Sequence, residues 1–258
     1  MHGVDVIVCN YKTPGDLQRF LDSYEESDSR NLWIVNVCPD REDTRVAVAY
    51  AEGREGVSVL EHHTNVGYAK AVNDAATYGS NEIIGIFNAD TELWSGVIEE
   101  CSDALSENPD WGVLGPRQVD RRNRITHGGV FGTHQRPELR AWRQVDEGQC
   151  SEVREAVTVS GSAYFVKRYV WLELTLCPIY QTYGAEGAFL PTQHYYEETW
   201  CSYHAWAHGY KVIYWGPSVM LHEWHQSSPV GGQADQLWYK ESKALFNEAC
   251  ERHGIPHD

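Results

Sequence analysis

Short apolar segments alternate with longer amphipathic ones along the first 90 residues. Residues 4–11, 31–38, 57–62 and 82–90 are apolar runs rich in Val, Ile and Leu, and they predict buried strands. Between them, residues 13–27, 46–53 and 68–79 predict helices from the spacing of their apolar side chains. This alternation predicts an α/β fold, with a mostly parallel sheet flanked by helices.

The second half of the chain is less regular. Strand patterns occur at 111–119, 156–168 and 211–224, and Gly216-Pro217 interrupts the last of them. Residues 195–210 and 234–254 predict helices that end at a glycine. No linker rich in Pro, Gly or Ser separates the halves, so we expect one compact unit.

Polar residues follow the predicted strands at the point where each strand ends. Ligands of parallel sheets bind beyond the carboxyl ends of the strands, so these residues predict a binding cleft. Asp90 has two interpretations, because an acid after a strand can cap a helix or ligate a metal. The strand-end residues are Asn10, Tyr11, Asn36, Asp40, Asn65 and Asp90.

Composition narrows the function classes. The net charge of −16 disfavours duplex nucleic acid and anionic lipid as partners. The seven cysteines include no C-x-x-C pair, which favours reduced thiols over a disulfide framework. No signal-peptide pattern and no run of 18 apolar residues occurs, so we expect a cytoplasmic protein without a transmembrane segment.

Several motifs occur in an order that resembles family 2 glycosyltransferases, and within them the soluble rhamnosyltransferase-like enzymes with the GT-A fold. The resemblance covers roughly residues 4 to 228. The motifs are "VDVIVCNYKTP", "NVGYAKAVN", "FNADTEL", "GSAYFVKR", "YYEETWCSYHAWAHGYKV" and "VMLHEWHQSS".

The resemblance implies a Rossmann-like nucleotide-sugar half at 1–116 and an acceptor-binding and catalytic half at 117–233. The helix predicted from its apolar spacing forms the remaining segment, 234–258. It implies inverting transfer from a UDP- or dTDP-sugar to an acceptor hydroxyl, on a saccharide or another glycoconjugate. The last helix would cap the acceptor half or form a homodimer.

The resemblance also assigns the metal and the base. Asp90 and His222 would hold Mn²⁺ or Mg²⁺, and the imidazole favours Mn²⁺; His225 is a weaker candidate. Glu198 would be the base that deprotonates the acceptor, with Glu197 as the alternate. Acids in a first helical turn are stabilising in any case, so a purely structural role stays open.

The remaining site residues follow from the same motifs. Residues that would meet the sugar or acceptor are Gly161, Ser162 and Trp224, and the Arg-rich run 117–124 is either an anionic-acceptor site or a solvated loop. Asp40 matches the acid that accepts a hydrogen bond from N3–H of the nucleobase, uracil or thymine. Residues that would bind the nucleotide are Cys9, Asn10, Tyr11, Asn36, Asp40, Asn65, Gly67, Lys70, Asn73, Asn88 and Ala89.

Three other hypotheses remain. His204 and His208 have the i, i+4 spacing of a helical zinc pair, with Cys201 as a third ligand, but a zinc protease would need Glu where Ala205 stands. The ten Trp residues would also suit a non-catalytic carbohydrate-binding module. The third hypothesis is an inactive relative of the glycosyltransferases.

Overall fold

The structure is a computed structural model that describes residues 2–177, 186–223 and 233–257. Most strands belong to one mixed sheet, and the strands are β1 (Val4–Asn10), β2 (Arg30–Val37), β3 (Val57–His62), β4 (Ile83–Asn88), β5 (Thr91–Glu92), β6 (Trp111–Val119), β7 (Ile125–His127), β8 (Val130–Thr133), β9 (Arg136–Leu139), β10 (Val153–Glu155), β11 (Ala163–Lys167) and β12 (Lys211–His222). The helices are α1 (Pro14–Ser23), α2 (Arg41–Ala51), α3 (Tyr68–Ala76), α4 (Val97–Glu107), α5 (Arg168–Thr175), α7 (Glu197–Ala207) and α8 (Gln233–His253).

The strand order of the large sheet creates a switch point next to β1. The order is β10-β12-β6-β11-β4-β1-β2-β3, and β1, β2, β3 and β4 are mutually parallel where they pair. The chain therefore leaves β1 toward β2 and β3, then returns to place β4 on the other side of β1. Such a reversal opens a crevice beyond the carboxyl ends of the two strands, which is where α/β sheets bind ligands.

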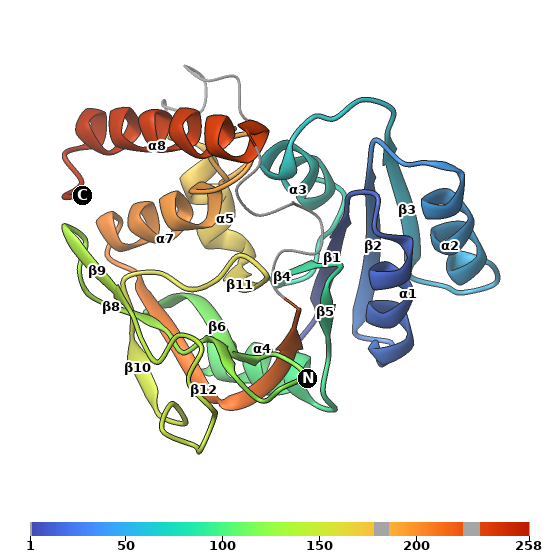
Figure 1. Cartoon of the computed structure of the whole chain (residues 1–258), viewed down its shortest axis with the longest axis horizontal. Helices are drawn as coiled ribbons and strands as arrows, with labels where there is room; N and C mark the ends of the chain where they lie inside the picture. The colour runs from blue at the N-terminus through green and yellow to red at the C-terminus, as the bar shows by residue number, and fades with distance from the viewer. Residues whose placement is uncertain (1, 178–185, 224–232, 258) are drawn as a thin grey trace.

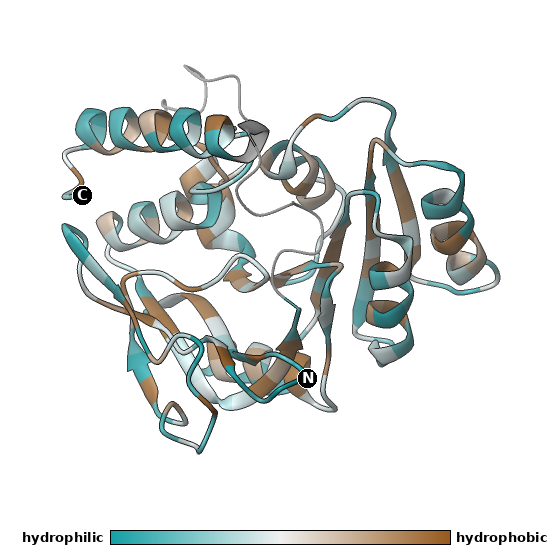
Figure 2. Ribbon diagram, in the orientation of Figure 1, coloured by the Kyte–Doolittle hydropathy of each residue, from teal (hydrophilic) through white to brown (hydrophobic). Residues whose placement is uncertain are grey.

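Helices cover both faces of this sheet, as the α/β prediction requires (Figure 1). One buried cluster packs α1, α2 and α4 against the sheet, and a second packs α3, α5 and α7 against its other face. Figure 2 shows apolar residues concentrated in the sheet and polar residues on the outer turns of α1, α2 and α8. Burial on both faces explains why β1 is largely apolar and does not alternate, with Asp5 and Asn10 as its two buried polar residues.

The C-terminal helix α8 lies across α7, far from α2 (Figure 1). Phe246, Ala249 and Cys250 of α8 are buried against Trp200 and Tyr203 of α7. This third cluster attaches the end of the chain to the helix that begins at Glu197. The sheet itself contains strands from both of the halves expected from the sequence.

Most of the predicted elements are confirmed, and the differences have local causes. Helix α2 begins at Arg41 and not at residue 46, because Asp40 caps it: Asp40 Oδ1 accepts from the backbone N–H groups of Glu42 and Asp43 at 2.8 and 3.0 Å. The strand expected at 156–168 begins only at Ala163. Helices α4 and α5 and the short strands β5 and β7–β10 were not predicted.

Strand β12 is continuous through Gly216-Pro217, with an irregularity in its pairing to β6 between Trp215 and Val219. This irregularity accommodates Pro217, because proline has no backbone N–H to donate to a neighbouring strand. Among the described residues, no helix is both long enough and apolar enough to cross a bilayer.

Candidate functional site

A cavity of about 320 Å³ opens at the switch point beyond β1 and β4. It collects segments from the whole length of the chain: the ends of β1, β4 and β12, the loop before β11, the loop before α7, and the first turns of α8. Its lining residues are Cys9, Tyr11, Thr13, Val37, Asn65, Tyr68, Asn88, Ala89, Asp90, Ser160, Gly161, Ser162, Gln193, His194, Tyr195, Tyr196, Glu197, Glu198, Thr199, His222, Trp238 and Tyr239.

Asp90 and His222 lie side by side in this cavity. Antiparallel pairing of β5 with β12 sets Thr91 opposite His222, which brings the residue before Thr91 to the imidazole. The distance from His222 Nε2 to Asp90 Oδ1 is 3.5 Å, and both side chains are less than 10% exposed. The backbone N–H of Glu223 also donates to the carbonyl of Asp90 at 3.0 Å, which fixes the turn.

Gln118 orients this histidine. His222 Nδ1 lies 3.0 Å from Gln118 Oε1, and Ser162 Oγ donates to the same oxygen at 2.7 Å. An amide oxygen only accepts, so Nδ1 donates to Gln118, and Nε2 is the ring nitrogen that faces Asp90. A histidine oriented through its second nitrogen beside a carboxylate is a typical donor set for a divalent cation, so the residues present fit the metal expected from the sequence.

The two adjacent glutamates at the start of α7 face the same cavity. Glu197 is 4% exposed, and its Oε2 accepts from Thr192 Oγ1 at 3.1 Å. Burial raises the pKa of Glu197 to about 8, and the charge of Glu198 adds to this rise. Burial also raises the pKa of Glu198, which is the more exposed of the two. Two close carboxyls whose pKa values are both raised by burial suit acid–base chemistry near neutral pH.

Gly161 leaves room for Glu198. A Cβ placed on Gly161 would lie 3.2 Å from Glu198 Cγ and 3.3 Å from its Cδ. Tyr68, on the first turn of α3, donates its hydroxyl to the carbonyl of Gly161 at 3.0 Å. The position of Glu198 therefore depends on the loop before β11 and on α3, both distant in the sequence.

The loop that enters α7 has unusual backbone geometry. Tyr195 and Tyr196 have φ angles of 74° and 70°, a left-handed conformation that costs non-glycine residues roughly 1–3 kcal/mol each. The start of α8 supports this loop, since Tyr196 donates its hydroxyl to that of Tyr239 at 2.8 Å and Ser242 Oγ donates to the carbonyl of His194 at 2.6 Å. Strain of this kind is commonly retained at functional sites.

Asn65 joins two loops at the wall of the cavity. Its Oδ1 accepts from the backbone N–H of Gly67 at 3.1 Å and from Gln193 Nε2 at 3.0 Å. Gly67 has a φ of +83°, and a Cβ there would lie 3.1 Å from the carbonyl oxygen of Gln193. Only glycine tolerates both conditions, which explains its place before Tyr68.

Some of the residues predicted to bind the nucleotide have structural roles outside the cavity lining. Asn10 and Asn36 are fully buried, and Asn10 Nδ2 donates to Asn36 Oδ1 and to Asp43 Oδ1 at 2.9 and 2.8 Å. Asp40 caps α2, as described above. These side chains fix the strand ends next to Cys9 and Tyr11, which do line the cavity.

Two residues of α3 behave in the same way. Asn73 is 2% exposed and exchanges two hydrogen bonds with the backbone of Phe189, at 2.9 and 3.1 Å. Lys70 Nζ pairs with Asp74 on the helix surface at 2.9 Å. Neither belongs to the cavity lining.

Trp224 and His225 lie outside the described residues.

Two of the four arginines in the run 117–124 form ion pairs. Arg117 is buried in β6 and pairs with Asp146 at 3.1 Å, and Arg121 pairs with Glu92 and Glu223. None of its arginines lines the cavity described here.

Sequence reasoning missed several residues of the site. Gln118, which contacts His222 without lining the cavity, lies within an ordinary strand pattern and gave no signal. Tyr68, Gln193, Trp238 and Tyr239 reach the cavity only because α3, α8 and the loop before α7 converge there. The aromatic content of the chain indicated that aromatic side chains line a cleft, but it did not indicate which ones.

A comparison with known protein families identifies the family of the chain. The model of the family described as "Glycosyl transferase family 2" matches residues 5–143. No curated protein sequence matches the chain.

Solved structures share the fold at low sequence identity. A mannosyltransferase from Pyrobaculum calidifontis in complex with GDP-Man and Mn²⁺ has a TM-score of 0.64 at 16% identity, covering 97% of this chain and 64% of that one. GalNAc-T7 with UDP, GalNAc and Mn²⁺ has a TM-score of 0.66 at 12% identity, covering 100% and 55%. S. aureus TarS residues 1–349 has a TM-score of 0.63 at 12% identity, covering 96% and 65%.

The chain spans less than two thirds of the length of each of these structures. The fold is therefore the mixed α/β fold of GT-A glycosyltransferases, which confirms the predicted fold class, while the rhamnosyltransferase-like branch stays a prediction. Since the family model covers more than half of the sequence, the chain belongs to glycosyl transferase family 2.

Proposed function

We propose that this protein transfers a sugar from a nucleoside diphosphate sugar, UDP- or dTDP-linked, to a hydroxyl group of an acceptor, with inversion at the anomeric carbon. The observation that carries the proposal is that one cavity contains both a pair of side chains suited to hold a cation and a pair of carboxyls suited to acid–base chemistry. Asp90 with His222 forms one, and Glu197 with Glu198 forms the other.

Asp90 and His222 would hold Mn²⁺ against the diphosphate. When bound, the cation supplies positive charge that stabilises the departing nucleoside diphosphate. Gln118 keeps the imidazole in the tautomer that can act as a ligand, and Ser162 keeps Gln118 in place. Cys9, Tyr11, Asn65, Asn88 and Ala89 line the same cavity and would contact the nucleotide. 

Glu198 would take the proton from the acceptor hydroxyl. Its neighbour Glu197 has the higher tendency to stay protonated, because burial and the charge of Glu198 both raise its pKa. Glu198 is therefore the carboxylate available as a base, and Gly161 leaves the space in which it lies. Attack from the face opposite the leaving group inverts the anomeric centre.

The rim of the cavity supports a saccharide acceptor. Tyr195, Tyr196, Trp238 and Tyr239 all line it, and Tyr239 is 44% exposed. Aromatic faces with a polar edge suit sugars, which combine apolar C–H faces with hydroxyl groups. A saccharide or glycoconjugate is accordingly the acceptor class that we propose.

A transfer assay tests this function. The protein is incubated with UDP-, dTDP- and GDP-sugars and a panel of saccharide acceptors, with Mn²⁺ or with EDTA, and the anomeric configuration of the product is read by NMR. We expect β-linked product from an α-linked donor, with Mn²⁺ only, and a loss of about 10²-fold or more in Asp90→Asn. The control is Asp28→Asn, an exposed aspartate outside the cavity. Retention of configuration, or full activity of Asp90→Asn, contradicts the mechanism; sugar binding without turnover by any donor indicates a carbohydrate-binding protein.

A further inference from the structure

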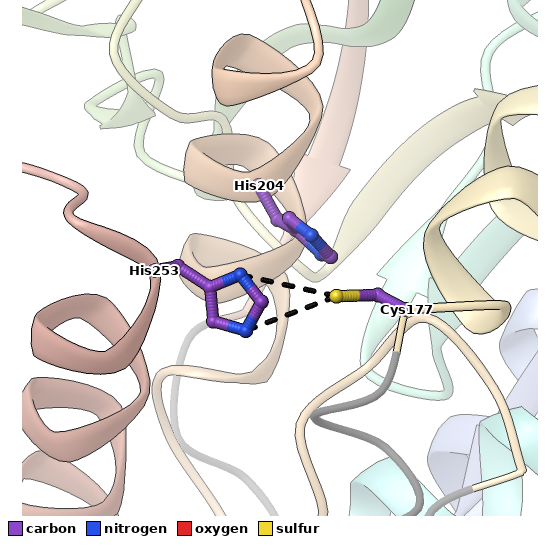
Figure 3. A group of neighbouring side chains, drawn as sticks. All are labelled: Cys177, His204 and His253. Atoms are coloured by element: carbon purple, nitrogen blue, oxygen red, sulfur yellow. Dashed lines mark hydrogen bonds between the residues drawn. The ribbon is translucent and has the colours of Figure 1, made fainter.

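A second group of metal-binding side chains lies apart from the cavity. Cys177 lies two residues after the end of α5, His204 belongs to α7, and His253 is in the last turn of α8. Figure 3 shows the three side chains pointing toward one another from these three segments. Their potential ligand atoms all lie within 4.8 Å of one another, and none of the three residues lines the cavity.

The spacing is close to that of a tetrahedral metal site. Zinc takes sulfur at about 2.3 Å and imidazole nitrogen at about 2.0–2.1 Å, so a sulfur and a nitrogen on one tetrahedral zinc are about 3.6 Å apart. Cys177 Sγ lies 3.8 Å from both ring nitrogens of His253. To coordinate a shared cation, the His253 ring would turn so that one of its nitrogens points toward the common centre.

The surroundings keep both imidazoles in the protonation state that binds metals. His204 is 1% exposed, and burial lowers its pKa to about 3, with smaller effects from His208 and His253. Burial also lowers the pKa of His253. Both are therefore neutral at pH 7, as a metal ligand must be. The Trp200 ring is tilted against that of His204 and edge-on to that of His253, with centroids 4.8 and 5.6 Å apart, and these contacts limit the motion of both rings.

We propose that Cys177, His204 and His253 form a site for a thiophilic divalent cation, zinc in the first place, with solvent as the fourth ligand. Binding releases the thiol proton of Cys177 to solvent and leaves a thiolate–metal bond. Thiolate with imidazole selects zinc over the harder Mn²⁺ proposed for Asp90 and His222.

Such a cation would tie three segments together. It links the end of α5 and the last turn of α8 to α7, whose first turn holds Glu197 and Glu198. Its expected effect is on stability, because a cation that binds only the folded state shifts the unfolding equilibrium. The site does not depend on the proposed transfer reaction.

Cobalt and zinc titrations of the purified, tag-free protein test the site. We expect one Co²⁺ per chain, a thiolate-to-cobalt charge-transfer band, displacement of Co²⁺ by Zn²⁺, and a higher Tm with Zn²⁺. Cys177→Ser should abolish the band, and His253→Gln should weaken Zn²⁺ binding about 100-fold or more. Matched controls are Cys38→Ser, at a partly exposed thiol elsewhere, and His257→Gln, near the same end of the chain.

A variant of the proposed catalytic cation site separates this test from the test of the transfer reaction. Asp90→Asn should keep the band, which makes the result independent of the catalytic proposal. Should Cys177→Ser fail to fold, His253→Gln decides by its loss of zinc affinity. A wild-type protein without a thiolate–cobalt band, or a band that survives both Cys177→Ser and His253→Gln, overturns the proposal.

Discussion

At the scale of single residues, Glu197 and Glu198 have identical side chains but different surroundings. Glu197 turns into the protein and accepts from Thr192, whereas Glu198 stays partly exposed against Gly161. The sequence offered both as candidates for the base, with Glu198 preferred. The structure adds a physical reason for that preference: Glu198 is the less buried of the two, and its charge contributes to the raised pKa of Glu197.

Replacing Glu198 by Gln removes the base without changing the size of the side chain. We expect kcat to fall about 10²–10⁴-fold with little change in donor affinity. Because burial raises the pKa of Glu198, the wild-type rate should increase with pH through a midpoint above the usual range of a glutamate. Steady-state rates from pH 5 to 9 measure both effects. Glu197→Gln is the matched control, and a larger loss in that variant would exchange the two roles.

Stability should also depend on the protonation of Glu197. In the folded protein its carboxyl has a pKa of about 8, whereas an unfolded glutamate titrates near 4.5. The folded state therefore binds more protons between these values, so stability is fully present below pH about 4.5 and is lost as pH rises toward 8. Urea unfolding of wild type and Glu197→Gln in EDTA should show a difference that grows in favour of the variant with rising pH. A difference that is constant from pH 5 to 8 contradicts the assignment.

At the scale of elements, the caps and pairings of secondary structure determine which polar residues reach the cavity. Asp40 belongs to a capping box with Asp43, and Asn10 bonds to Asn36 and Asp43 in the interior. These contacts hold β1, β2 and α2 together. The strand-end position that suggested nucleotide binding is therefore compatible with a structural function for these residues.

Asp40→Ala distinguishes the two functions. Loss of an N-cap costs about 1 kcal/mol, which corresponds to a decrease of about 3 °C in Tm for a domain of this size. We expect that decrease with the Kd for UDP unchanged within about twofold. Asp40→Asn keeps the cap and should retain the wild-type Tm. A tenfold weaker binding of UDP by Asp40→Ala would show that the Asp40 carboxylate contacts the uracil of the nucleotide.

At the scale of the whole molecule, the cavity depends on segments that close over it from both ends of the chain. β1 contributes Cys9, while α8 contributes Trp238 and Tyr239. A nucleotide bound here with its metal contacts only the folded state. Binding should therefore stabilise the protein as a single unit.

Thermal unfolding with UDP measures this stabilisation. At a UDP concentration about 100 times Kd, we expect a gain of about 2.7 kcal/mol, or about 5–10 °C in Tm, in the presence of Mn²⁺. EDTA should remove most of the gain, and Asp90→Asn should lose the part that depends on Mn²⁺. An equal gain with EDTA would show that Asp90 and His222 do not bind the diphosphate through a metal.

The sequence by itself determined the α/β class, the parallel strands β1–β4 and the presence of acids after strand ends. These properties follow from local periodicity and from residue chemistry, which short segments carry alone. It also marked Asp90, His222 and Glu198, through a resemblance in the order of motifs.

Only the tertiary structure decided which of these residues meet. Gln118 orients His222 across 104 positions of sequence, and Cys177 reaches His253 across 76. Such contacts depend on the register of the whole sheet and on how α7 and α8 pack, and no local pattern encodes either. The packing of the sheet also decides which face of β1 meets the cavity: Cys9 lines it, while its neighbour Asn10 points to the opposite side and is buried.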